Sequence, residues 1–116
     1  MFAEVSAKPG VLQIKFIGPS VGQREVPIIS DLVMPELERR LASIKRVVFD
    51  FSEISFMNSM GLGLCIDLRN RIVEAGGKAI LFGLNQELAE LFKMVKVDRL
   101  FTIAKDKAEL AKKLAA

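Results

Sequence analysis

Two periods of apolar and polar residues alternate along the chain and predict its strands and helices. Between residues 11 and 17 the apolar side chains recur at every second position, as expected for a half-buried strand. Its apolar face would carry Leu12, Ile14 and Phe16. Further apolar segments predict an edge strand at 3–7, central strands at 46–51 and 78–82, and a short last strand at 100–103.

Apolar residues spaced three and four positions apart predict helices in the second half of the chain. One helix is expected from Ser59 to about Ala75 and to end at a pair of glycines. Its inward stripe would be formed by Leu64, Leu68 and Ile72 and widened by Cys65, Ile66 and Val73. A second would follow the capping residue Asn85 and turn inward Leu88, Leu91, Phe92 and Val95. Asp106 and Glu109 form a capping box that predicts a last helix at 107–114.

The segment between the first two strands and residue 46 has the weakest pattern. Residues 21–29 contain a glycine, a proline and two charges, and are expected to form a loop. Pro35 is best placed at the first position of a helix, where its missing N–H is harmless. That helix would bury Leu37, Leu41 and Ile44 and expose the charged residues Glu36, Glu38, Arg39 and Arg40.

The order of elements predicts an α/β fold in a single domain that spans residues 1–116. From residue 46 onward strands alternate with helices, and such connections are right-handed and join parallel strands. The hairpin formed by the first two strands makes the sheet mixed, with four to five strands and about four helices.

The composition excludes several kinds of active site. The 116 residues include no His, so there is no His-based triad, general base or metal ligand. The single cysteine, Cys65, can form neither an internal disulfide nor a CxxC pair, and its place in a helix pattern predicts a small core residue. We expect no catalytic residue, no cofactor and no metal.

The net charge and the lengths of the apolar runs indicate which surroundings the protein is suited to. A net charge of +3 without a basic stripe or interleaved aromatic residues does not favour nucleic acid. No secretory signal and no apolar run long enough to span a membrane is visible. We therefore expect a cytoplasmic location without membrane insertion.

Asn58 and Ser59 stand where a strand and turn pass into a helix. Both are good capping residues, and the N–H groups at a helix start favour a phosphate there, either of a ligand or attached to Ser59. Gly61 and Gly63 lack the third glycine of a dinucleotide fingerprint, so Gly61 is better explained by close packing of the helix.

Three interpretations of Ser59 follow from the residues. It is a plain helix cap, a nucleophile, or a site of regulatory phosphorylation. A nucleophile needs a base, and the pattern places none beside it. Phe56, Met57 and Met60 flank the serine and fit either the core or an adaptable protein-binding surface.

Residues 50–63, DFSEISFMNSMGLG, closely resemble the signature of bacterial anti-sigma-factor antagonists, the STAS-domain family. The similarity continues through EAGGK at 74–78, LFKM at 91–94 and VDRLF at 97–101. The resemblance implies a mixed sheet with helices packed mainly on one face. It also implies binding to an anti-sigma factor that is a serine kinase, release by phosphorylation of Ser59, and resetting by a serine phosphatase. The partner-binding residues would be Phe56, Met57, Asn58, Ser59, Met60 and Gly61.

Two residues and one segment depart from the family pattern. Asn58 replaces the usual Asp, which keeps the cap but removes a charge that would assist phosphorylation or docking. Residues 18–31 replace a shorter segment that in the family lies beside the serine, and Met60 replaces a small residue. These departures support an alternative, a STAS interaction module that is not phosphorylated, such as a stressosome-type scaffold or the small subunit of a lipid-transport ABC system. Neither the partner's identity nor the oligomeric state follows from the sequence.

Overall fold

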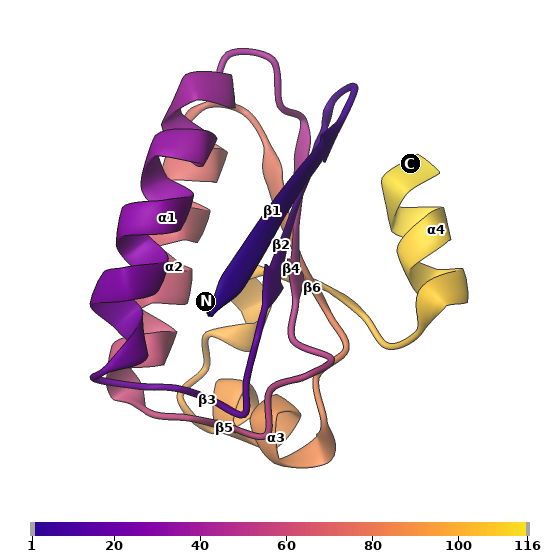
Figure 1. Cartoon of the computed structure of the whole chain (residues 1–116). Coiled ribbons are helices and arrows are strands. Elements are labelled where there is room, and N and C mark those ends of the chain that lie inside the picture. The colour runs from indigo at the N-terminus through magenta and orange to yellow at the C-terminus, as the bar shows by residue number, and fades with distance from the viewer. Residues whose placement is uncertain (1, 116) are drawn as a thin grey trace.

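The computed structural model describes residues 2–115, which fold as strands and helices in alternation (Figure 1). Its strands are β1 (Ala3–Lys8), β2 (Val11–Phe16), β3 (Ser20–Val21), β4 (Arg46–Asp50), β5 (Phe56–Met57), β6 (Lys78–Phe82) and β7 (Thr102–Ala104). Its helices are α1 (Glu25–Arg40), α2 (Ser59–Glu74), α3 (Gln86–Met94), the short 3₁₀ helix η1 (Asp98–Leu100) and α4 (Lys107–Ala115).

Five strands form the main sheet in the order β1-β2-β4-β6-β7. Only β1 and β2 are antiparallel; the other neighbours are parallel, which confirms the predicted mixed sheet. Helices α1 and α2 cover one face of the sheet, and α4 lies on the opposite face (Figure 1). The parallel strands β4 and β6 end on the side of the sheet where β3, β5 and α3 lie (Figure 1). A helix that follows a strand begins near the end of that strand, so the start of α2 lies on this side, near β3, β5 and α3.

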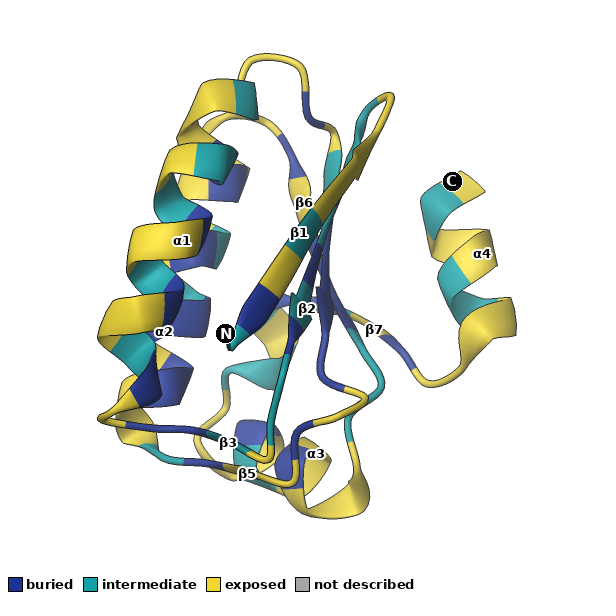
Figure 2. Ribbon diagram, in the orientation of Figure 1, coloured by how far each residue is buried: buried dark blue, intermediate teal, exposed yellow. Residues whose placement is uncertain are grey.

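Phenylalanine side chains form the centre of the core, between the sheet and its helices. The rings of Phe16 and Phe51 stack at 4.6 Å between centroids, and Phe101 lies edge-on to Phe49 and to Phe92. All five are buried, and Figure 2 shows the buried positions in dark blue on the central strands and on the sides of α1 and α2 that face them. Stacked and edge-on aromatic pairs add to the stabilisation from buried area. The predicted apolar face of residues 11–17 is confirmed by the complete burial of Leu12, Ile14 and Phe16.

The first helix begins ten residues earlier than the sequence predicts. Residues 21–29 were expected to be a loop and Pro35 a helix start, but α1 runs from Glu25 through Pro35 to Arg40. A proline inside a helix costs roughly 3 kcal/mol because one hydrogen bond is lost. The buried residues Ile29, Val33 and Leu37, each one turn apart, outweigh that cost, since a buried aliphatic side chain contributes about 1.5–3 kcal/mol.

Three smaller expectations are also wrong. Residues 98–100 form a 3₁₀ turn, so the last strand begins at Thr102 rather than at residue 100. Val95 and Val73, both expected to face inward, are exposed. Val95 lies at the C-cap of α3, past the last turn that faces the core. The two-residue strands β3 and β5 pair with each other in a small second sheet, which the pattern did not predict.

The helix ends match their predicted capping residues. Asn85 Oδ1 accepts from the N–H of Leu88 (2.7 Å), and Asp106 Oδ1 accepts from the N–H of Glu109 (2.8 Å). Gly76, at the end of α2, has a φ of 88°, which favours glycine. Cys65 is fully buried in α2, as expected, and its burial raises the pKa of the thiol to about 12. At neutral pH this sulfur is therefore a core atom and not a nucleophile.

Candidate functional site

The candidate site is the start of α2, where Asn58 caps the helix. Its backbone is extended, and its Oδ1 accepts from the N–H of Met60 (3.0 Å) and of Gly61 (3.2 Å). The cap predicted from Asn58 and Ser59 is thus confirmed, with Asn58 as the cap and Ser59 as the first residue of the helix. Ser59 therefore lies at the positive end of the helix dipole, in the turn whose N–H groups at Met60 and Gly61 bond to Asn58.

A short ladder fixes this helix start against the segment that follows β2. Strands β3 and β5 pair in parallel, with Ser20 opposite Phe56 and Val21 opposite Met57. The carbonyl of Val21 then accepts from the N–H of Asn58 (3.3 Å). Residues 18–31, the segment that departs from the family pattern, thus lie directly beside Asn58 and Ser59.

Gly61 lets α2 approach this ladder closely. A Cβ at this position would lie 2.5 Å from the Val21 carbonyl oxygen and 2.6 Å from Met57 Cγ, closer than carbon atoms normally come. At Gly63, two residues later, nothing lies within 4 Å of such a Cβ. The expectation that Gly61 serves close packing is supported, with β3 and β5 as the surface that the helix approaches.

The six predicted partner-binding residues divide into two groups. Phe56, Ser59 and Met60 are exposed, and Asn58 is half-buried. The exposed fractions of Phe56 (60%) and Met60 (42%) are large for apolar side chains. Met57, only 2% exposed, and Gly61 are buried, so they shape the surface from beneath and do not present a side chain to a partner.

Helix α3 extends the site beyond the residues that the sequence indicated. The side-chain amide of Asn85 donates to the carbonyls of Ile54 and Ser55 (both 3.4 Å), which ties the start of α3 to the loop before β5. A groove of about 170 Å³ lies between β5 and α3. It is lined by Ser55, Phe56, Met57, Glu87, Leu88 and Leu91. Asn85 was recognisable as a cap, but no local signal indicates that its amide bonds to a loop 30 residues earlier.

Asn58 and the acidic residue Glu25 both lie close to Gly22. A Cβ on Gly22 would lie 3.2 Å from Asn58 Nδ2 and 3.5 Å from Glu25 Oε1, so both side chains contact this glycine. The Glu25 carboxylate accepts from the N–H of Gly22 (2.9 Å) and pairs with Arg24 (3.2 Å). An aspartate at position 58 would bring a second carboxylate to this place and repel the first. The neutral amide of Asn58 fits next to the Glu25 carboxylate.

The charged groups nearest the site stabilise structure. Asp50 accepts from the N–H of Ser52 (2.9 Å) and from the side-chain amide of Gln13 (3.4 Å), which makes it a turn-stabilising carboxylate. Glu53 pairs with Lys15 (2.8 Å), and the hydrogen bond and charge of Glu53 raise the pKa of the Lys15 ammonium. Lys15 is therefore protonated at neutral pH and cannot serve as a base.

None of the helices within residues 2–115 combines the length and the apolar character needed to cross a lipid bilayer. That same range contains no cluster of three or more His, Cys, Asp or Glu side chains placed to hold a metal ion.

A family model matches this chain, and several solved structures share its fold. The family model described as the STAS domain matches residues 3–110. An anti-sigma-factor antagonist (STAS) domain protein from Planctomyces limnophilus is 19% identical, with a TM-score of 0.87 over 98% of each chain. An anti-sigma factor antagonist from Mycobacterium paratuberculosis is 13% identical, with a TM-score of 0.83 over 98% of this chain and 93% of that one. The Bacillus cell fate determinant SpoIIAA in its phosphorylated form is 15% identical, with a TM-score of 0.70 over 95% and 97%.

Proposed function

The chain belongs to the STAS-domain family, and on this premise we propose that it is an anti-sigma factor antagonist that works by partner switching. In its unmodified form it binds an anti-sigma factor that is also a serine kinase, through the surface around Ser59. Phosphorylation of Ser59 releases that partner, and a serine phosphatase restores binding. The protein is a substrate and a switch in the cytoplasm, and it neither performs catalysis nor needs a cofactor.

One observation carries this proposal: an exposed serine hydroxyl at a helix start, flanked by two exposed apolar side chains. Phe56 and Met60 lie on either side of Ser59 in the sequence, and both are exposed although they are large apolar side chains. Large exposed apolar side chains of this kind mark surfaces where a protein partner docks. A kinase bound there would have the Ser59 hydroxyl within its interface.

The physical effect of a phosphate at Ser59 differs between the free and the bound protein. In the free protein the added charge of about −1.5 to −2 lies at the start of α2, where the helix dipole and the surrounding water tolerate it. In a complex the same charge would be buried among Phe56, Met60 and the partner, without water to solvate it. Phosphorylation therefore weakens binding while leaving the fold intact.

Asn58 supports a second candidate, a STAS interaction module that is not phosphorylated, such as a stressosome-type scaffold or the small subunit of a lipid-transport ABC system. If an aspartate at this position assists phosphate transfer, its replacement by an amide removes that help. The nearby Glu25 carboxylate occupies the space facing Asn58 but already binds Gly22 and Arg24, so it is a poor substitute.

Incubation with the cognate kinase and ATP, followed by peptide mass spectrometry, distinguishes the two candidates. We expect one phosphate on Ser59 in the wild type and none in Ser59→Ala. An Asn58→Asp variant is tested in parallel, both alone and combined with Glu25→Gln to remove the repulsion between the two carboxylates. Phosphate on another residue, or phosphate on Ser59 only in the Asn58→Asp variants, would exclude the switch and favour the unphosphorylated module.

A further inference from the structure

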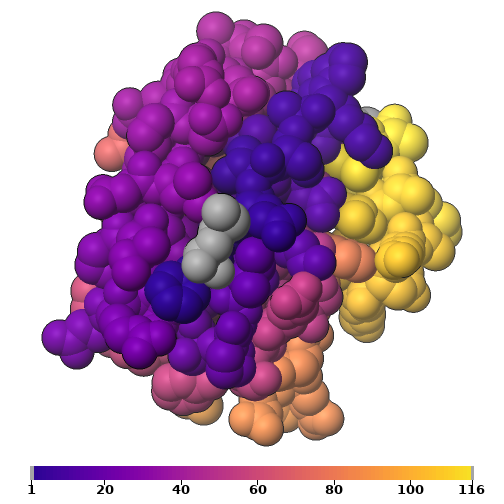
Figure 3. Space-filling view, viewed as in Figure 1, coloured from indigo at the N-terminus to yellow at the C-terminus, as the bar shows by residue number. Residues whose placement is uncertain are grey.

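Strand β1 forms an open edge of the main sheet. In the order β1-β2-β4-β6-β7 it has a neighbour on one side only. Figure 3 shows this indigo segment at the surface of the molecule, between α1 and α4. An unpaired edge presents N–H and C=O groups that another strand can bind. The exposed apolar surface around Phe56 and Met60 lies at the end of the sheet, so it is separate from this edge.

The register of β1 on β2 determines which backbone groups face outward. The N–H of Ile17 donates to the carbonyl of Phe2 (2.8 Å), so these two residues form a hydrogen-bonded pair. Such pairs alternate along an antiparallel ladder, which assigns Glu4, Ser6 and Lys8 to bonds with β2. The outward N–H and C=O groups are therefore those of the remaining residues, Ala3, Val5 and Ala7.

Opposite charges on β1 are spaced so that two copies can pair. Glu4 and Lys8 are exposed, lie on the same side of the strand because they are four residues apart, and form no ion pair within residues 2–115. Ser6 lies midway between them. If two copies of β1 meet antiparallel with Ser6 opposite Ser6, each Glu4 lies opposite the Lys8 of the other copy.

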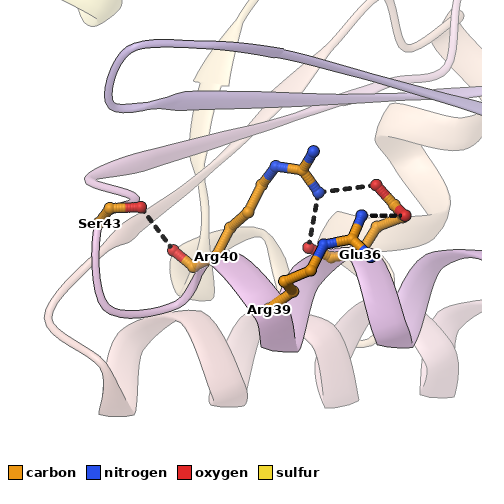
Figure 4. Close-up of polar contacts among 4 residues, drawn as sticks. All are labelled: Glu36, Arg39, Arg40 and Ser43. Atoms are coloured by element: carbon orange, nitrogen blue, oxygen red, sulfur yellow. Dashed lines mark hydrogen bonds and ion pairs between the residues drawn. The ribbon is translucent and has the colours of Figure 1, made fainter.

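The side of β1 that faces α1 adds apolar contact. Leu32 (37% exposed) lines a groove of about 360 Å³ with Ala3, Glu4, Val5 and Glu36, and Ile28 is exposed one turn earlier on α1. Glu36 is held by ion pairs with Arg39 and Arg40, as Figure 4 shows, and hydrogen bonds from Arg40 and Arg39 lower its pKa. The groove thus combines an apolar floor with a charged end that is already neutralised.

We propose that two copies of this chain associate through β1 to form a symmetric dimer with one continuous sheet. Val5 of each copy forms the hydrogen-bonded pair with Ala7 of the other, and Glu4 pairs with Lys8 across the interface. Leu32 and Ile28 of the two copies are brought together above this junction. The isologous arrangement is closed, so it produces a dimer and not a fibre.

Other registers lose either backbone bonds or the opposite charges. A shift by one residue would place the outward N–H and C=O groups opposite groups already bonded to β2. A shift by two that puts Val5 opposite Val5 keeps the backbone bonds, but it leaves Glu4 facing Ser6. A shift in the other direction places Val5 opposite Pro9, which has no N–H to donate. The register centred on Ser6 keeps both Val5–Ala7 pairs and places Glu4 opposite Lys8, and only Ala3 then lies opposite Pro9.

Sedimentation equilibrium of the purified chain and two charge variants tests this dimer. The wild type is expected to change from monomer to dimer through the micromolar range. Glu4→Lys places two lysines opposite each other at both ends of the interface and is expected to weaken dimerisation roughly tenfold. Lys8→Glu places two glutamates there and is expected to have the same effect. The double variant Glu4→Lys/Lys8→Glu restores the opposite charges and should restore the wild-type constant. Glu4 also lies opposite Lys15 in the β1–β2 ladder, so thermal unfolding of each variant is measured to show that the hairpin is retained.

A second measurement identifies the strand. Amide hydrogen exchange at Val5 and Ala7 should slow as the protein concentration rises, because their N–H groups are free in the monomer and bonded in the dimer. A monomer throughout the concentration range would overturn the proposal. So would a dimer whose strength is the same in the single and double charge variants, or one without added protection at these two amides.

Discussion

Gly61→Ala is expected to lower the free energy of unfolding by about 1–3 kcal/mol, which is the usual cost of forcing atoms into a filled space. The new methyl group would lie 2.5 Å from the carbonyl oxygen of Val21 and 2.6 Å from Met57 Cγ. The carbonyl belongs to a strand that is itself paired, so it cannot yield freely. The start of α2 would have to move away from β3, which weakens the bond from the Asn58 N–H to Val21.

Gly63→Ala is the matched control, in the same helix and two residues later. Nothing lies within 4 Å of the added methyl group, so the change only improves helix propensity. It should raise the free energy of unfolding by roughly 0.5–1 kcal/mol. Urea unfolding followed by circular dichroism measures both variants. Equal effects in the two variants would show that α2 does not rest against β3 and β5 as described.

Ser59→Asp is expected to weaken partner binding about tenfold, which corresponds to roughly 1.4 kcal/mol, while Ser59→Ala should bind as tightly as the wild type. An aspartate at the first position of α2 suits the helix dipole, so the free protein should remain folded. In the complex, its carboxylate would be desolvated beside Phe56 and Met60 without a partner charge. Calorimetric titration of the anti-sigma factor with each variant gives the affinities.

Thermal unfolding of both variants is the control for this comparison. If Ser59→Asp unfolds at the same temperature as the wild type or higher, its weaker binding is a property of the interface. Equal affinities of the Asp and Ala variants would contradict an interface centred on Ser59. A loss with Ser59→Ala comparable to that with Ser59→Asp would instead indicate that the hydroxyl itself is a contact.

Local sequence patterns predicted those helices and strands whose conformation depends on residues close together in the chain. The alternation at 11–17, the apolar runs of β4 and β6, and the caps Asn58 and Asn85 all depend on neighbours within a few positions. The parallel pairing of the later strands followed from the alternation of strands and helices. The motif around Ser59 indicated the family, which the comparison with the STAS-domain model then showed.

Non-local contacts explain what the sequence did not indicate. Residues 25–34 form a helix in spite of Pro35, because Ile29 and Val33 are buried against elements that lie far along the chain. The pairing of β3 with β5 involves two residues in each strand, too few for an alternation to be visible. The spacing of Met57 was compatible with either a core or a surface position. Only the position of β5 in the fold shows that this side chain is buried.

These contacts matter for the proposed switch. Asn58 keeps the cap of α2, and its amide lies against Gly22 beside Glu25, so the residue that departs from the family pattern is matched to the segment that departs as well. The groove beside α3 adds Glu87 and Leu91 to the surface around Phe56. A partner for this protein is therefore expected to match a surface that includes α3 in addition to the start of α2.

The most direct test of the central claim compares the affinity of the anti-sigma factor for the same protein with and without a phosphate on Ser59. Calorimetric titration with the unmodified protein, the phosphorylated protein, and the phosphorylated protein after treatment with a serine phosphatase supplies the three values. We predict tight binding of the unmodified protein, an affinity at least about tenfold lower for the phosphorylated protein, and full recovery of affinity after phosphatase treatment. Equal affinity in all three states would contradict the switch.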